Sequence, residues 1–162
     1  MLFRSVEGAL AQVGLGNMMG ALAFGDVATT PLVRALKEDI PTRRSAAALA
    51  LGAMDATEPV IEALSTGASD VAPDVRASAL ESLGALSAGE KYIVTGLDDA
   101  HLAVARSAAE ILAHHPSFNV SILKGAFKTR GARGRSLLAE ALSMGPLLDV
   151  HVPLLRDAIL ND

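Results

Sequence analysis

Two pairs of adjacent carboxylates are the first residues of this chain that could support chemistry. They are Glu38-Asp39 and Asp98-Asp99, and paired acids can serve as general acid and base. Both pairs lie in turns beside expected helix ends, where a carboxylate accepts hydrogen bonds from free backbone N–H groups. We therefore interpret both pairs as capping residues and predict no catalytic residue.

The histidines lack the spacing of a metal site. They are His101, His114, His115 and His151, and no two stand three or four residues apart, the spacing that places side chains on one helix face. The chain has no cysteine, which excludes a Cys-based zinc site, a disulfide scaffold and a thiol nucleophile. It also lacks the Gly-x-Ser-x-Gly pattern and a phosphate-binding loop. We expect no metal, no cofactor and no enzymatic activity.

Composition and charge narrow the class of partner. The net charge is −4, and the charged residues, 20% of the chain, form no long basic tract, which argues against nucleic acid. The uncharged stretch 8–25 is interrupted by five glycines, so a helix pair explains it better than a membrane span. The absence of cysteine fits a cytoplasmic location. One basic cluster could meet an acidic protein surface or a phosphate, although a solvated loop also explains it; it comprises Lys124, Lys128, Arg130, Arg133 and Arg135.

A repeat of about 30 residues is the element that must position these side chains. Four copies carry an arginine followed by an Ala/Ser/Leu-rich run, and these arginines are Arg44, Arg76, Arg106 and Arg135; a fifth, weaker copy without arginine spans 17–25. Hydrophobic residues make up 51% of the chain and aromatic residues only 3%, so we expect closely packed helices with small side chains in the core. No run alternates apolar and polar residues, and we expect no strand.

Each repeat is predicted to form two helices. The first is short and begins with a proline in two copies, at Pro31 and Pro59, and the second follows an Asp- or Pro-marked turn. Thr30 is a plausible N-cap before Pro31, and Gly52 and Gly84 occupy positions typical of left-handed helix ends. We see no domain boundary and predict one domain over 1–162. The expected helices span 2–13, 17–24, 30–38, 42–53, 58–66, 73–86, 90–97, 100–114, 118–127, 132–144 and 150–160.

The repeat resembles the HEAT-like repeat, and more narrowly its short phycobilisome-lyase type. The residues that carry the resemblance are Pro31-Leu-Val-Arg-Ala-Leu36, a turn acid, the repeat arginine and the Ala-Ala-Ala-Leu-Ala-Leu-Gly run that ends at Gly52. It is closest over 30–64, and it departs at His114 and Ser143, which replace the terminal glycine. The resemblance implies an all-α superhelix of about five helical hairpins, with the second helices on a concave face. Most members are binding scaffolds.

The four repeat arginines have a family role that agrees with the physics. An arginine in the first turn of a second helix can reach a turn carboxylate or carbonyl groups of the neighbouring repeat. Stacked in this way, Arg44, Arg76, Arg106 and Arg135 would form a ladder that ties the repeats together. A ligand-binding role is the alternative reading of the same residues.

The functional hypothesis is a non-catalytic protein–protein interaction scaffold or small subunit with a protein partner. A bilin lyase-like, tetrapyrrole-binding protein is the alternative implied by the family name, and self-association through exposed repeat ends is a third possibility. The partner-binding candidates are polar positions of the second helices: Arg43, Ser45, Ser78, Glu81, Ser82, Ser107, Glu110, Ser136 and Glu140.

Overall fold

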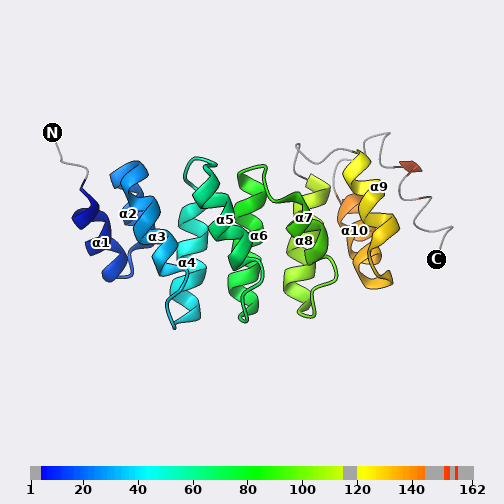
Figure 1. Ribbon diagram of the computed structural model, residues 1–162. Coiled ribbons are helices and arrows are strands. Elements are labelled where there is room, and N and C mark those ends of the chain that lie inside the picture. The colour runs from blue at the N-terminus through cyan, green and yellow to red at the C-terminus, as the bar shows by residue number, and fades with distance from the viewer. Residues whose placement is uncertain (1–4, 115–119, 145–151, 154–155, 157–162) are drawn as a thin grey trace. The chain divides into compact units, whose positions relative to one another are not determined.

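The chain is all-helical over the residues that the structure, a computed structural model, describes; these are 5–114, 120–144, 152–153 and 156. They contain no β-strand, so the all-α prediction is confirmed. Figure 1 shows the elements in chain order. They are α1 Val6–Gly14, α2 Met18–Ala21, the 3₁₀ segment η1 Leu22–Ala28, α3 Thr29–Ala35, α4 Pro41–Leu51, α5 Glu58–Gly67, α6 Pro73–Ala85, α7 Glu90–Gly96, α8 Leu102–His114, α9 Val120–Thr129 and α10 Ala132–Met144.

The contacts of the chain group into two compact units, Met1–Gly89 and Glu90–Asp162. In the first unit, α3 packs on α4 and α5 packs on α6, which gives two helical hairpins. The second helices of these hairpins, α4 and α6, lie along one another, as do the first helices α3 and α5. In the second unit, α7 packs on α8, and α8 lies along α10. Neighbouring hairpins within each unit therefore stack through like helices, as a helical repeat requires.

Leucine, alanine and valine make up most of the buried core of each unit. In the first unit, Leu32, Leu51, Leu64 and Leu80 are almost completely buried. In the second unit, the residues that are almost completely buried are Ile93, Leu97, Leu112, Leu138 and Leu142. Alanines such as Ala47 and Ala108 fill the space between helices, because a methyl group allows two backbones to approach closely.

Two details of the predicted helix ends are wrong. Helix α3 begins at Thr29, because η1 runs directly into it, so Thr30 is not an N-cap and Pro31 lies inside the first turn. Gly52 has a right-handed backbone, with φ −65°, and Gly84 lies within α6. Positive φ angles occur instead at Ser87, shortly after the end of α6, and at Gly16, Gly25 and Gly89.

The last predicted helix, 150–160, falls mostly outside the described residues. Within that range the structure describes 152–153 and 156, and these residues are helical. The single domain predicted for 1–162 stays a prediction. In the described part of the chain, no helix has the length and apolar character needed to cross a membrane.

Candidate functional site: the groove between α8 and α10

The repeat arginine of α4 is held by the turn of the next repeat. The Nε and Nη2 groups of Arg44 each donate to one carboxylate oxygen of Asp70, both at 2.8 Å. Its Nη1 group donates to the carbonyl oxygens of Glu38 and Asp39 at 2.9 and 3.0 Å. The hydrogen bonds from Arg44, helped by the N–H of Ala72, hold the pKa of Asp70 below its usual value. The same contact raises the pKa of Arg44, which is only 8% exposed.

Two further repeat arginines also donate hydrogen bonds to carbonyl oxygens of the turn before their own helix. Nη1 of Arg76 donates to the carbonyl oxygens of Asp70 and Val71 at 2.9 and 3.2 Å. Nη1 of Arg135 donates to the carbonyl oxygen of Arg130 at 3.0 Å. Like the arginine of α4, each is the fourth residue of its helix. At this position, an arginine reaches back over the turn that precedes its own helix.

Arg106 does not occupy that position, so the predicted ladder needs a correction there. It is the fifth residue of α8, and the fourth is the buried Ala105. The register is fixed by two equivalent turns, because Asp70 and Asp99 each accept a hydrogen bond from the N–H two residues later, at 2.8 Å. Arg106 is exposed and forms no hydrogen bond or ion pair within the described residues. It corresponds in position to Ser45 of α4.

Three of the predicted partner-binding serines hold α4 and α6 together instead. The hydroxyl oxygens of Ser45 and Ser78 are 2.7 Å apart, and the Ser82 hydroxyl donates to the carbonyl oxygen of Ala48 at 2.9 Å. Ser78 is 7% exposed and Ser82 is 3% exposed, so a partner would not reach them. A Cβ added to Gly52 would lie 2.5 Å from Cβ of Ser82, which shows how closely the two helices approach.

Arg43 also has a structural contact rather than a free surface position. Its Nη2 group donates to the carbonyl oxygen of Val13 at 2.7 Å, and its guanidinium forms an ion pair with Glu38. Val13 lies in the last turn of α1, and its carbonyl oxygen also accepts the N–H of Gly16 at 2.9 Å. Arg43 therefore fastens α4 to the end of α1. Glu81 is exposed on α6.

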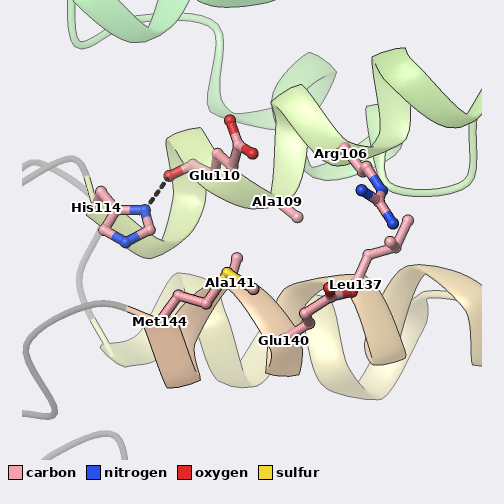
Figure 2. A pocket seen from close by; sticks show the side chains of 8 residues that line it. All are labelled: Arg106, Ala109, Glu110, His114, Leu137, Glu140, Ala141 and Met144. Atoms are coloured by element: carbon pink, nitrogen blue, oxygen red, sulfur yellow. Dashed lines mark hydrogen bonds between the residues drawn. The ribbon is translucent and has the colours of Figure 1, made fainter.

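The second unit holds an open groove where α8 and α10 run side by side (Figure 2). Its volume is about 260 Å³. Buried apolar side chains form the floor, namely Ala109, Leu137 and Ala141, and the exposed Met144 also lines the groove. Charged and polar side chains form the rim, namely Arg106, Glu110, Glu140 and His114. The groove thus brings together Glu110 and Glu140, two of the predicted residues, whereas Ser107 and Ser136 do not line it.

The rim follows from helical spacing. Arg106, Glu110 and His114 recur every four residues along α8, and Figure 2 shows them in sequence along one side of the groove. Glu140 is the ninth residue of α10, as Glu110 is of α8, so the two carboxylates come from equivalent positions. Nδ1 of His114 lies 3.0 Å from the carbonyl oxygen of Glu110, which orients the ring at the end of the helix.

Sequence reasoning missed the floor of this groove and two residues of its rim. Leu137, Ala141 and Met144 follow the spacing of an apolar helix face, and that spacing alone indicates core. Arg106 was assigned to the ladder, and His114 was interpreted only as a helix-terminal residue. One feature of the sequence could have indicated the groove. Glu110 and Glu140 occupy the same position, the ninth, in two second helices that follow one another in the repeat.

The charged side chains on the rim of the groove are not paired with one another. Among the described residues, the side chains of Arg106, Glu110 and Glu140 have no ion-pair partner, so their charges are available to a ligand. The same described ranges contain no group of three or more His, Asp or Glu residues that could hold a metal ion. Comparison of the chain with protein-family models and with curated protein sequences finds no match.

Proposed function

We propose that this protein is a non-catalytic, HEAT-like interaction module whose α8–α10 groove binds a segment of a partner protein. The observation that carries the proposal is the groove itself, an apolar floor between unpaired charges of both signs. Protein interfaces commonly combine a buried apolar centre with a polar rim, and arginine and methionine are enriched in them. Both walls are helices packed on a core, so the surface is formed before a partner arrives.

The arrangement of charges indicates which segment would fit. Arg106 offers a bidentate donor to a carboxylate of the partner. One helical turn further along the groove, Glu110 and Glu140 offer acceptors to a lysine or arginine. The floor at Ala109 and Ala141 is lined by methyl groups and leaves room for one apolar side chain between these contacts. A segment with an acidic, an apolar and a basic residue in this order satisfies the groove.

The tetrapyrrole alternative is less well supported by these residues. A linear tetrapyrrole carries carboxylates and a long conjugated system, which require several cations and aromatic neighbours. The α8–α10 groove is lined by one arginine, two carboxylates and no Phe, Tyr or Trp. A partner peptide with charges of both signs therefore fits better than an acidic pigment.

The absence of native cysteine makes a site-specific crosslinking experiment possible. Ser136→Cys places a unique thiol on the exposed surface of α10 beside the groove, and Thr66→Cys places the matched control on the exposed surface of α5. Each variant is labelled with a photoactivatable maleimide and irradiated in native extract. We expect a discrete crosslinked protein from the Ser136→Cys variant only.

A charge reversal then tests whether the groove itself is responsible. Arg106→Glu changes an exposed side chain that has no partner among the described residues, so the fold is retained, as circular dichroism would verify. We expect the crosslinked product to disappear in the double variant with Ser136→Cys. The same product from both thiol positions, or a product insensitive to Arg106→Glu, would refute the groove as the binding site. A visible absorption shift on adding a bilin would support the alternative function.

A further inference from the structure

A second groove in the same unit lies between the first helices α7 and α9. Its volume is about 340 Å³. Val94, Ile122 and Ala126 supply apolar walls, and Lys91 and Arg130 stand among the charged residues that line it. None of these residues belongs to the α8–α10 groove, so this surface lies outside the function proposed above.

The glycine in this groove has no packing reason within the described residues. Gly125 lies inside α9, and a Cβ added there would meet nothing within 4 Å. Its φ lies outside the positive range that disfavours other residues, so the backbone conformation does not require glycine. Glycine inside a helix is less favourable than alanine, because it increases the backbone conformational entropy of the unfolded chain without stabilising the helix. The chain therefore carries a residue that weakens α9 and leaves its backbone bare at the groove.

The corresponding position of the first unit carries a long side chain. The groove between α3 and α5 is lined by Glu62 and Thr66, and the Thr66 hydroxyl donates to the carbonyl oxygen of Glu62 at 3.1 Å. In α9, the Thr129 hydroxyl donates to the carbonyl oxygen of Gly125 at 2.8 Å. Gly125 thus corresponds to Glu62. A long charged side chain in one groove is replaced by exposed backbone in the other.

The charges around Gly125 are mainly positive and weakly neutralised. Lys91 is exposed, has no ion-pair partner among the described residues, and rests 4.7 Å from the centre of the Tyr92 ring. Arg130 reaches Asp98 only at 3.6 Å, a distance longer than that of a strong charge-assisted hydrogen bond. Lys124 and Lys128 are exposed on α9 as well. Glu90 is the acidic side chain that lines the groove.

We infer that the α7–α9 groove is a second docking site, which binds an acidic amphipathic segment of a partner protein. Carboxylates of the segment pair with Lys91 and Arg130, and its apolar side covers Val94 and Ile122. The segment crosses α9 at Gly125, where the missing side chain lets two backbones approach. The positive charges favour an acidic segment. The absence of a side chain at Gly125 allows the backbone of that segment to approach the backbone of α9.

The test uses a synthetic probe of defined chemistry. A fluorescein-labelled peptide about four helical turns long carries leucine on one face and glutamate on the other, and its counterpart carries lysine in place of glutamate. Fluorescence anisotropy measures the affinity of the full-length chain for each peptide. We expect the glutamate peptide to bind and the lysine peptide not to bind. Amide NMR signals of α7 and α9 should shift on titration.

Gly125→Ala is the decisive variant, because binding and stability should change in opposite directions. Alanine raises Tm by about 2–4 °C through helix propensity but weakens binding of the glutamate peptide about tenfold or more by blocking the approach. Gly14→Ala is the matched control: it adds a Cβ that also meets nothing within 4 Å, in α1, and should leave the affinity unchanged. Lys91→Glu should weaken binding without altering Tm.

Several results would overturn the inference. They are unchanged affinity in both Gly125→Ala and Lys91→Glu, equal binding of the two peptides, or no binding of the glutamate peptide. If Gly125→Ala lowers Tm instead, Lys91→Glu decides the matter. Shifts confined to α8 and α10 would assign the peptide to the other groove. Because Arg106→Glu leaves the α7–α9 groove intact, failure of either proposal can be distinguished from failure of the other.

Discussion

The α4–α6 and α8–α10 helix pairs have the same packing register but different surfaces. In α4–α6, the hydroxyl groups of Ser45 and Ser78 form a hydrogen bond across the pair. The corresponding residues of α8 and α10 are Arg106 and Leu137, and here a groove of about 260 Å³ is present. The same register of the repeat thus carries a serine–serine hydrogen bond in one helix pair and a groove in the other.

The turns that join the repeats differ in a second way. In the first unit the Asp70 carboxylate takes two hydrogen bonds from the buried guanidinium of Arg44. In the second unit Asp98 accepts a hydrogen bond from the N–H of Gly131 at 3.0 Å, and its ion pair with Arg130 is long. The link at Asp70 therefore depends on a charged pair, which makes it sensitive to substitution and to pH.

Removing the carboxylate of the first link should have the largest effect on stability. Asp70→Ala leaves Arg44 without its bidentate acceptor and the Ala72 N–H without a partner. We expect a loss of about 2–3 kcal/mol, less than for a fully dry pair, because the two side chains remain 10% and 14% exposed. Urea denaturation followed by circular dichroism measures it. A loss no greater than that of an exposed alanine substitution would contradict the role of this pair.

The same pair should make stability depend on acid in a defined window. The pKa of Asp70 is lowered in the folded state, so its contribution is fully present above the ordinary carboxyl pKa of about 3.9. It is lost as the pH falls below that value through the depressed pKa. Denaturation at a series of pH values should show a constant difference between the natural chain and Asp70→Ala near neutrality, and a shrinking difference below about pH 4. A difference that persists at low pH would contradict this.

The close approach of α4 and α6 can be tested with a single methyl group. Gly52→Ala places a Cβ 2.5 Å from Cβ of Ser82 and 2.8 Å from its Cα, so the helices must separate. We expect a loss of about 1–3 kcal/mol, although alanine is the better helix former. The matched substitution in α8, Ala113→Gly, should cost only about 0.5–1 kcal/mol through helix propensity. Stabilisation by Gly52→Ala in urea denaturation would show that the contact is not tight.

The sequence predicted the helices well, because arginine, alanine and glycine positions repeat with the hairpins. It could not predict which serines are buried. Ser78 and Ser82 look like surface residues beside Glu81, yet a hydroxyl that bonds to a neighbouring helix can be buried at little cost. It also could not predict the floor of the α8–α10 groove, since Leu137 and Ala141 have the spacing of core residues whether or not a neighbour covers them.

Arg106 shows why the register of a repeat is hard to derive from sequence alone. In an alanine-rich helix, the alignments that match Arg76 with Ala105 or with Arg106 differ by one residue. The choice depends on where the helix begins after Asp99, and a turn sequence defines that point poorly. A shift of one residue rotates a side chain by about 100°, which moves it from the turn contact to the groove.

Substitution of Arg106 should therefore have the smallest effect on stability. Because this side chain is exposed and lacks a hydrogen-bond or ion-pair partner among the described residues, Arg106→Ala should change the free energy of unfolding by no more than about 0.5 kcal/mol. Arg135→Ala, which removes the donor to the Arg130 carbonyl oxygen, is the comparison within the same unit and should cost about 1 kcal/mol. Urea denaturation of both variants measures the difference. A loss for Arg106→Ala as large as that for Arg135→Ala would restore Arg106 to the ladder and leave the groove without its cation.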